Sequence, residues 1–532
     1  MRFLTSLPLL FVLAVLVLCL GIWEATGLTG KDEFYLGLRT PLEMLHDDHW
    51  LVPFLDGVPR IKKPPLLYWL GRASYELFGA SLVSARMLVV LFGGLLVVAT
   101  AAIGRRLSGE RTTGTVAALI LLGMLGLATE SRRFMLDIPV AALSASAFWL
   151  LLIWSERPRW PWLSGASLLL AAAFLIKGPI AVIVCGSGLL ALLICRADSR
   201  RQLLAHWPSL CAHALLFAAL ALPWFYLVKQ LHPAAAEAAF AGEIESRQFF
   251  QPNLNALFGL FSIGLPWVFV FAVHLGQRWR NDDDLRRLLL TWFLAATLPF
   301  LLIRAFDRYL VGSLVPLAIF LACLLPQLRS RLAFRLGMLV ALLPGLALGG
   351  FAAWFGLGGW PWLLVPALYL AWAWWNDRGL GHLLAAPIIY WTTLLALLFP
   401  ALGINALPAE VVALGRQQAV VFFEGPQPAM LAILSGQPHR QYRDLAAHAA
   451  ELAQAGTPVF AESDDVALLQ EKLAGAGYRA VPLGSYQTLA SHGSGLRFAR
   501  NGAGAAEWQA AFVSRSLAPL QTQIEWFRVE AR

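Results

Sequence analysis

The sequence predicts a mainly α-helical protein that crosses a membrane many times and ends in a small α/β domain. Hydrophobic residues make up 58% of the 532 residues and charged residues 14%, and the mean hydropathy is +0.65. Soluble globular chains are about 45–50% apolar and about 25% charged. This composition excludes a cytosolic enzyme, a secreted disulfide-rich protein and a disordered chain. The five cysteines all lie in apolar runs, which excludes a disulfide framework and a cysteine-based metal site.

Thirteen apolar runs account for most of the first 403 residues. We expect each run to cross the membrane once as a helix, because about 20 apolar residues span the hydrocarbon core. The first run resembles a signal peptide, but it lacks a small-residue cleavage site and contains Trp23, so we interpret it as an uncleaved helix. The runs lie near 7–28, 84–104, 114–128, 138–153, 160–176, 180–195, 206–228, 255–276, 288–303, 309–325, 336–356, 359–375 and 383–403.

Basic residues in alternate loops orient these helices. If the N-terminus is cytoplasmic, every cytoplasmic loop contains arginine, as the positive-inside rule requires. An odd number of crossings then places the C-terminal segment in the periplasm of a Gram-negative bacterium, with the protein in the inner membrane. The arginines of the cytoplasmic loops are Arg105, Arg106, Arg111, Arg157, Arg159, Arg196, Arg200, Arg201, Arg278, Arg280, Arg286, Arg287, Arg329, Arg331, Arg335 and Arg378.

The composition changes near residue 404. From there on, strand-like runs alternate with helix-like runs, and Gly, Asp and Ser separate them, as in small α/β domains. We therefore expect a transmembrane domain over 1–403 and a soluble periplasmic α/β domain over 404–532. The strand-like runs are 419–423, 458–461 and 478–482, and the helix-like runs are 445–455 and 465–474.

Two predicted periplasmic loops, 29–83 and 229–255, are unusually long. Both contain amphipathic stretches that are too short or too polar to cross a membrane. Such helices lie in the plane of the membrane interface. We expect them at 34–45, 66–78 and 234–250.

The predicted periplasmic face carries many cations, although the positive-inside rule disfavours them there. Lysine and arginine just above a bilayer commonly bind a phosphate that is carried on a lipid. Carboxylates among such cations are kept ionised, and we expect this of Asp32. The cations are Lys31, Arg39, Arg60, Lys62, Lys63, Arg72, Arg132, Arg133, Lys177, Lys229, Arg247, Arg304 and Arg308, and the acids are Asp32, Glu33, Asp137, Glu243, Glu245 and Asp307.

Six motifs on this face also have purely structural explanations, which remain open at this point. Their shared location on one face favours a common site. In chain order, the alternatives are Asp32-Glu33 as a helix N-cap, Lys62-Lys63 as a headgroup anchor, Asp137 as an ion-pair partner of Arg132 or Arg133, Lys177 as a snorkelling cation, Glu243 as an i,i+4 partner of Arg247, and Arg304 to Tyr309 as an interfacial belt.

Other classes of site are disfavoured. The ten histidines do not cluster, and His46 with His49 is interpreted as a solvated helix end rather than a metal site. No Gly-rich phosphate loop follows a strand, so we expect no nucleotide and no ATP-driven pump. The basic residues lie in loops between apolar runs, so we expect no nucleic acid. The polar groups lie at one face rather than near the bilayer midplane, which disfavours a secondary transporter.

Several short motifs follow one another in order over roughly residues 1–325. They are Asp32-Glu33-x-Tyr35, Trp50-Leu51-Val52-Pro53 with Asp56-Gly57, Lys63-Pro64-Pro65-Leu66-x-Tyr68-Trp69, Leu136-Asp137, Lys177-Gly178, Pro223-Trp224, Glu243-x-x-x-Arg247, Leu265-Pro266-Trp267 and Tyr309-Leu310. This order of motifs resembles the lipid A aminoarabinose transferases and the wider group of protein O-mannosyltransferase-like membrane glycosyltransferases, which have the GT-C fold.

The resemblance implies transfer of a sugar from undecaprenyl (polyprenyl) phosphate to an acceptor on the periplasmic side. Lipid A, lipopolysaccharide or another envelope glycan is the favoured acceptor, and a protein acceptor is the alternative. By position, Asp32 is the candidate base, and Lys63, Arg247 and Tyr309 hold a phosphate. The full set of candidates is Asp32, Asp137 and Glu33 as catalytic acids or bases, Lys62, Lys63, Lys177, Arg247, Arg308 and Tyr309 as donor-phosphate ligands, and Tyr35, Arg133 and Glu243 as acceptor contacts or structural support.

One departure from the family concerns a metal. In the aminoarabinose transferases the residue before the motif lysine is commonly Glu, the residue after the glutamate of the second long loop is commonly His, and a metal is associated with that area. The corresponding residues here are Lys62 and Ile244. We therefore expect no cofactor, and a divalent metal is the alternative. The departure also leaves the identity of the sugar open.

The residues suit an inverting transfer. A lipid phosphate is a good leaving group, so nearby cations need only stabilise the departing anion, and one such contact lowers a barrier by about 2.7–4 kcal/mol. A base that takes the proton of the acceptor hydroxyl contributes about 10²–10⁴-fold. A two-carboxylate glycoside hydrolase fits less well, because it needs a protonated acid.

Two hypotheses of other classes remain. They are a flippase or transporter of a lipid-linked sugar and a non-catalytic scaffold. The partners we expect are a donor lipid, an acceptor and membrane lipids, with the chain acting as a monomer.

Overall fold

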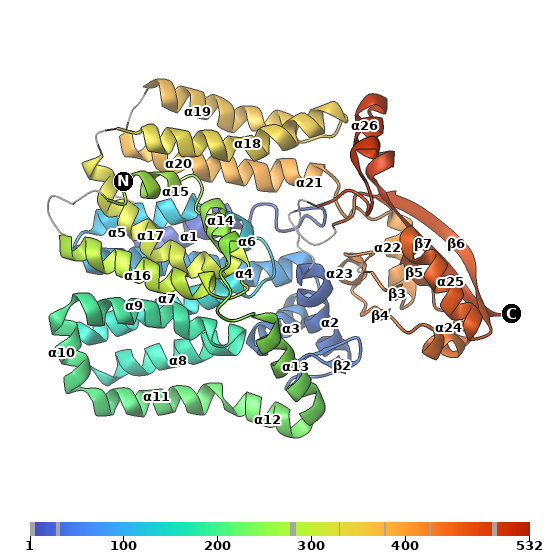
Figure 1. Cartoon of the computed structure of the whole chain (residues 1–532), viewed down its shortest axis with the longest axis horizontal. Coiled ribbons are helices and arrows are strands. Elements are labelled where there is room, and N and C mark those ends of the chain that lie inside the picture. The colour runs from blue at the N-terminus through green and yellow to red at the C-terminus, as the bar shows by residue number, and fades with distance from the viewer. Residues whose placement is uncertain are drawn as a thin grey trace.

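The computed structural model describes residues 6–27, 32–276, 283–328, 330–376, 379–425, 427–491 and 497–532. Helices from α1 (Leu7–Leu18) to α21 (Phe399–Ala401) form a broad bundle. The elements that follow form a mixed α/β body at one end of this bundle (Figure 1). The molecule is therefore mainly helical, as the sequence predicts.

Seven helical segments in the described ranges are long and apolar enough to cross a membrane. Two further pairs of helices pass the same test but are sharply bent. The chain is therefore a multi-pass membrane protein. The seven segments are Leu82–Ser108 (α4), Asp137–Glu156 (α7), Trp160–Lys177 (α8), Trp207–Leu231 (α11 and α12), Asp307–Gln327 (η3, α17 and η4), Leu332–Trp354 (α18) and Leu380–Ala401 (within α20, η6 and α21).

Each of the thirteen apolar runs contains a helix, but thirteen crossings remain a prediction. The runs outside the seven segments form shorter, bent or more polar helices. They are α1, α5 (Arg111–Leu122) with α6 (Leu125–Glu130), α9 (Ile180–Cys195) with α10 (Ala197–Ala205), α14 (Leu254–Ile263) with α15 (Val268–His274), α16 (Asp283–Leu301), and η5 (Trp360–Leu363) with α19 (Leu364–Asn376).

Two of the thirteen apolar runs do not form single continuous helices. Over 255–276 the axes of α14 and α15 differ by 114°, at a break that contains Pro266, which lacks the N–H that a continuous helix needs. In the first run, α1 ends at Leu18 rather than near residue 28. Gly21 lies there in the left-handed region (φ 82°), and a Cβ on it would lie 2.8 Å from the backbone of Ala396. Only glycine fits both requirements.

Small residues allow the central helices to pack closely. Helices α4, α5, α7 and α17 (Leu314–Leu324) contribute to one large buried cluster. A Cβ on Gly114 of α5 would lie 2.3 Å from the carbonyl oxygen of Ala101 in α4, so these backbones are in direct contact. Such contacts replace the hydrophobic driving force that is missing within lipid.

The two long loops form the predicted short helices. A π-helical turn, η2 (Glu33–Gly37), leads into α2 (Arg39–His46), a hairpin of β1 (Phe54–Leu55) and β2 (Val58–Pro59) follows, and α3 (Leu66–Phe78) precedes α4. The second loop contains α13 (Pro233–Ser246). These elements lie at the end of the bundle that faces the α/β body (Figure 1).

The α/β body is built on a five-stranded sheet with strand order β4-β3-β5-β7-β6. Strand β3 is parallel to β4 and β5, with Val421 opposite Arg440 and Val459, whereas β7 is antiparallel to β5 and β6. The strands are β3 (Val421–Phe423), β4 (Arg440–Tyr442), β5 (Val459–Glu462), β6 (Tyr478–Thr488) and β7 (Thr522–Ala531), and the α-helices are α22 (Ala409–Gln417), α23 (Leu431–Ser435), α24 (Ala449–Ala455), α25 (Val466–Gly475) and α26 (Ala505–Ser514).

Alternating side chains of the sheet pack into two separate cores. Val421 and Phe423 of β3 pack in a cluster with residues of α24 and α25, whereas Phe422 packs with residues of α22 and α23. The sheet is thus covered by helices on both faces. The predicted strands and helices of the tail correspond to β3, β5, β6, α24 and α25. Strand β7, which joins β5 to β6, was not predicted.

Candidate functional site

A cavity of about 410 Å³ opens where the two long loops meet the ends of α7, α8 and η3 (Asp307–Ser313). Seven Lys and Arg side chains and three carboxylates line it, an excess of four positive charges. Apolar side chains such as Leu67 and Phe134 cover other parts of the wall. The predicted site residues that line this cavity are Asp32, Lys62, Lys63, Asp137, Lys177, Glu243, Arg247, Arg308 and Tyr309.

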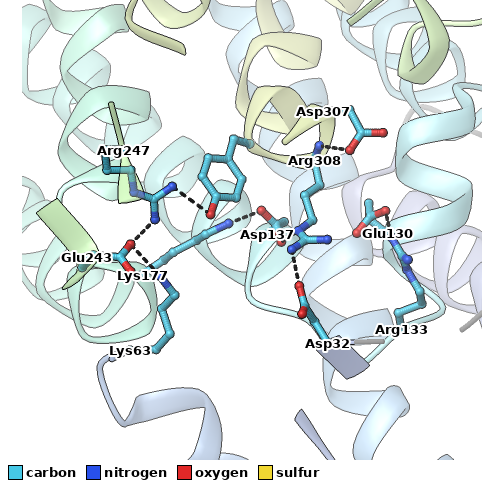
Figure 2. A network of polar contacts seen from close by, with 11 residues as sticks. Asp32, Lys63, Glu130, Arg133, Asp137, Lys177, Glu243, Arg247, Asp307 and Arg308 are labelled. Carbon is cyan, nitrogen blue, oxygen red and sulfur yellow. Dashed lines mark hydrogen bonds and ion pairs between the residues drawn. The ribbon is translucent and has the colours of Figure 1, made fainter. Parts of the chain in front are cut away.

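A chain of ion pairs crosses the middle of the site (Figure 2). Arg308 donates from Nη2 to Oδ2 of Asp32 at 2.5 Å, and its Nε lies 3.6 Å from Oδ2 of Asp137. Asp137 also accepts from Lys177. The side chains of Asp137 and Lys177 are buried, whereas that of Asp32 is 43% exposed. Of the two carboxylates in this series of ion pairs, Asp32 is therefore the one that an incoming molecule can reach.

Helix ends favour this arrangement of charges. Asp137 is the first residue of α7, and Lys177 is the last residue of α8. A carboxylate at a helix N-terminus and an ammonium at a helix C-terminus are both stabilised by the helix dipole. Gly178, at φ 63°, ends α8 directly after the lysine. The secondary structure thus places two opposite charges next to each other.

Two structural alternatives from the sequence are wrong. Asp137 does not pair with Arg132 or Arg133, because Arg133 pairs with Glu130 and Arg132 donates to the backbone carbonyls of Val17, Leu20 and Ala128. Lys177 does not snorkel towards water, because its side chain is buried and paired. The N-cap alternative for Asp32 is met only in position, because Asp32 directly precedes η2 but its side chain makes no capping bond.

A second cluster centres on Glu243 of α13 (Figure 2). Its Oε1 accepts from Nζ of Lys63 at 2.8 Å and also from Arg247, the expected i,i+4 partner. Arg247 donates to the hydroxyl of Tyr309 at 3.1 Å, and Nζ of Lys177 lies 3.7 Å from the centroid of the Tyr309 ring. Tyr309 thus connects the two clusters.

The loop residues of this cluster have shifted pKa values. Burial is the largest influence on Lys63 and lowers the pKa of its ammonium below the usual 10.5, although Glu243 acts in the opposite direction. Burial alone would raise the pKa of Glu243, but the hydrogen bonds and charges of Lys63 and Arg247 lower it below 4.5. Glu243 is therefore a carboxylate that holds two cations in place.

Glu33 does not line the cavity, which corrects its predicted catalytic role. Its side chain is fully buried and forms a two-bond pair with Arg86 of α4, at 2.8 and 3.0 Å. The backbone N–H of Phe134 also donates to it at 2.8 Å. Glu33 thus fixes the turn that follows Asp32 to α4 and to the segment before Asp137. Arg86 is a charged residue inside the apolar run 84–104, and such a residue usually has a buried partner. Its position was therefore the available sign that a carboxylate such as Glu33 is buried against it.

Two predicted site residues remain to be placed, Arg133 and Tyr35, and several cavity residues were not predicted. Arg133 does not line the cavity and pairs with Glu130 (Figure 2). The side chain of Tyr35, like Lys31, lies outside the described residues. Arg60, Ser246 and Arg304 line the cavity although they were not chosen as site residues. Their positions beside predicted motifs were the available signal. Glu130, also not chosen, is fully buried, and this burial raises its pKa.

The residues near Lys62 do not fit a metal site. Lys62 offers an ammonium, which is no ligand, and Ile244 is an exposed apolar side chain. Glu243 already accepts hydrogen bonds from two cations. Within the described ranges, no group of three or more His, Cys, Asp or Glu could hold a metal ion. We derive no step through a metal.

Comparisons with known proteins agree with this architecture. A family model described as dolichyl-phosphate-mannose-protein mannosyltransferase matches residues 62–226. An undecaprenyl phosphate-α-4-amino-4-deoxy-L-arabinose arabinosyl transferase of Sodalis glossinidius is 28% identical over 62% of this chain and 63% of its own length. Its counterpart in Yersinia pestis is 24% identical over 59% of each chain. The match therefore spans less than two thirds of the length of these curated relatives.

Solved structures show the same fold over nearly the whole chain. The crystal structure of ArnT from Cupriavidus metallidurans bound to undecaprenyl phosphate superimposes with a TM-score of 0.71 and 18% identity, and covers 97% of both chains. The structure of the same protein in the apo state has a TM-score of 0.70. Together these findings confirm the resemblance to the GT-C membrane glycosyltransferases.

The buried pair of Glu33 and Arg86 can be tested through stability. We expect Glu33→Ala to lower the free energy of unfolding by about 3–5 kcal/mol, because it leaves a guanidinium buried without its partner. Replacing both residues with methionine removes both charges and should recover much of this loss. Thermal and denaturant unfolding of the detergent-solubilised protein, followed by circular dichroism, measures the effect.

Glu156→Ala is the matched control, because Glu156 pairs with Arg106 at an exposed position. Its loss should stay within about 1 kcal/mol. Equal, small losses for Glu33→Ala and Glu156→Ala would contradict the role assigned to Glu33.

Proposed function

We propose that this chain is an inverting glycosyltransferase of the bacterial inner membrane. It moves a sugar from undecaprenyl (polyprenyl) phosphate to a periplasmic acceptor, namely lipid A or another envelope glycan. The observation that carries this proposal is a reachable carboxylate, Asp32, in the same cation-rich cavity as Lys63, Arg247 and Arg308. The names of the curated relatives and the lipid bound in the solved ArnT structure support the same substrate class.

The proposed arrangement in the membrane has two parts. Residues 1–403 form the transmembrane domain, with the N-terminus in the cytoplasm, and residues 404–532 form a periplasmic α/β domain. The cavity lies at the end of the bundle next to that domain, so the reaction takes place at the periplasmic surface. The excess of cations at this end fits a lipid phosphate held at the height of the headgroups.

The cations bind the donor phosphate and stabilise it as it departs. Lys63 and Arg247 are held by Glu243, and Arg308 is held by Asp32 and Asp137, so their charges are in place before the lipid binds. Preorganised charges of this kind stabilise a transition state without reorganisation cost. Lys62, Lys177 and Tyr309 complete the proposed phosphate site, and Asp137 keeps Lys177 and Arg308 in position.

Asp32 acts on the acceptor. In the transfer, the acceptor oxygen bonds to the anomeric carbon of the sugar while the bond from that carbon to the phosphate oxygen breaks. The proton of an acceptor hydroxyl passes to Asp32, and the lipid phosphate leaves towards the cations. Attack from the side opposite the phosphate inverts the anomeric centre. If the acceptor is itself a phosphate, it is already ionised, and Asp32 only orients it.

The role of Asp32 is tested by Asp32→Asn. We expect transfer to fall by about 10²–10⁴-fold, because the amide cannot accept the proton, while binding of undecaprenyl phosphate is retained. Mass spectrometry of the reaction products measures transfer, with the aminoarabinose lipid as donor and lipid A as acceptor. Asp198→Asn, at a fully exposed position, is the control for the lost charge. A fully active Asp32→Asn enzyme excludes Asp32 as the base, and movement of lipid across liposomes without a new glycosidic bond indicates a flippase.

The lowered pKa of Lys63 predicts a pH dependence of lipid binding. Only the protonated ammonium attracts the phosphate, so affinity for undecaprenyl phosphate should fall as the pH rises through the pKa of Lys63. Because that pKa lies below 10.5, the loss begins at a lower pH than for an ordinary lysine. Lys63→Arg should move the loss to higher pH, since guanidinium stays charged.

Binding titrations of both proteins with undecaprenyl phosphate between pH 7 and 11 measure this shift. Lys229→Arg, in the last turn of α12 and outside the cavity lining, is the control. If the affinity for undecaprenyl phosphate falls over the same pH range in Lys63→Arg and in the unmodified protein, Lys63 is excluded as a phosphate ligand.

The proposed orientation is tested with reporter fusions in a Gram-negative host. Alkaline phosphatase, which is active only in the periplasm, should be active when fused after Arg532 and inactive when fused after Arg106. The reverse pattern would place the cavity in the cytoplasm and remove the periplasmic acceptors from consideration.

A further inference from the structure

We infer that the C-terminal sheet positions the cavity through an ionic junction. In this junction Arg39 and Asp56 bind the backbone of His439 and of Gln441 in β4. This inference rests on the proposed function and extends it, because it makes residues 404–532 part of the transfer machinery. Arg39 and Asp56 are positioning residues in this account, since neither lines the cavity.

Three segments that are distant in sequence meet at Arg39. The arginine begins α2, and its side chain is only 5% exposed. It pairs with Asp56 and donates to the backbone carbonyl of His439 at 2.5 Å. Oδ1 of Asp56 in turn accepts the backbone N–H of Gln441 in β4 at 2.7 Å. Arg39 and Asp56 thus contact backbone atoms of this segment. These contacts depend on where the backbone lies and not on which side chains it carries.

Helix α2 also holds the hairpin directly. Glu43, one turn after Arg39, is buried and accepts the backbone N–H groups of Asp56 and Gly57, both at 2.7 Å. These two residues adopt left-handed backbone conformations, with φ of 56° and 74°. Such a turn is strained for Asp56 and persists only when its surroundings determine it. Glu43 on one side and the sheet on the other provide that constraint.

The junction is close in sequence to the two segments that carry the proposed base and the proposed phosphate ligands. Helical structure runs back from Arg39 through η2 to Asp32, the proposed base. After β2, the chain leads directly to Arg60, Lys62 and Lys63 in the cavity wall, and the N–H of Arg60 bonds to the carbonyl of Pro53 at 2.7 Å. The relative position of the base and the phosphate ligands therefore depends on how α2 and the hairpin are held together.

The sheet is itself fixed to the membrane helices. Four residues next to or within α23, namely Ala429, Met430, Ala432 and Ile433, belong to the same buried cluster as α4 and α7. His46, the last residue of α2, lies 3.3 Å from the carbonyl of Gly436. The α/β body is thus packed against the membrane helices through α23, and it can hold the junction in place.

The energetics favour a positioning role. A buried ion pair contributes little net stability, because desolvation of the two charges offsets their attraction. Its charges and directed hydrogen bonds nevertheless define one arrangement of the three segments. A misplacement of about 1 Å in a catalytic group costs up to about 10²-fold in rate, so a small relaxation at this junction affects catalysis before it affects folding.

The test is Asp56→Asn, which keeps the shape of the side chain and its acceptor for Gln441 but removes the charge that Arg39 faces. We expect kcat for transfer from the aminoarabinose lipid to lipid A to fall by about 10- to 100-fold. The donor KM should change less than kcat, because Lys63 and Arg247 are also held by Glu243 of α13. Arg39→Lys should retain more activity than Arg39→Gln.

Asp48→Asn is the matched control. Asp48 forms an ion pair with Arg72 in the same long loop, at 2.5 Å, but its side chain is largely exposed. We expect kcat of Asp48→Asn to match that of the unmodified protein. An Asp56→Asn enzyme with unchanged kcat, or a loss confined to thermal stability, would overturn the inference.

Hydrogen exchange separates this inference from the proposed function. In Asp56→Asn, amides of 32–46 and 58–63 should exchange about tenfold faster or more, with an unchanged melting temperature, whereas Asp48→Asn should leave 32–38 and 58–63 protected. This result supports the coupling even if the unmodified protein transfers no sugar, in which case the proposed function fails. Unchanged exchange around Asp32 and Lys63 in Asp56→Asn would show that the junction does not control the cavity.

Discussion

The structure depends on one constraint: a charge that is taken out of water at the edge of a membrane must have a partner. Asp137 and Lys177 satisfy each other at the ends of adjacent helices, and Arg308 bridges Asp137 to Asp32. Because these residues come from separate parts of the chain, each pair also ties two segments together. The need to pair buried charges thus brings the loops, the helix ends and the cavity into one arrangement.

The same constraint separates side chains that an incoming molecule can reach from side chains that only keep other residues in position. Glu33 is adjacent to Asp32 in sequence, yet it is fully buried against Arg86, whereas Asp32 remains 43% exposed at the cavity. Glu243 holds Lys63 and Arg247, and Glu43 holds the hairpin. Most of these carboxylates therefore hold other groups in place, and Asp32 is the most exposed of the three carboxylates that line the cavity.

The sequence predicts the class of fold and much of the site, for physical reasons that are specific to each residue. Motif order and the charges of the predicted periplasmic face point to Asp32, Lys63, Asp137, Lys177 and Arg247, and all of them line the cavity. Pairing between distant segments could not be predicted, because the sequence does not say that Asp137 faces Lys177 rather than Arg133. Bends at Pro266 and Gly21 were hidden within continuous apolar runs, and β7 was missed because its pairing with β5 and β6 is a long-range contact. The roles of the site residues remain predictions.

The most direct test of the central claim is an experimental structure of this protein with undecaprenyl phosphate. The account predicts that the phosphate lies in the cavity, with its oxygens within hydrogen-bond distance of Lys63, Arg247 or Arg308, and with Asp32 facing the open space beside it. A phosphate bound outside this cavity, or bound there with Asp32 turned away and shielded from any acceptor, would contradict it.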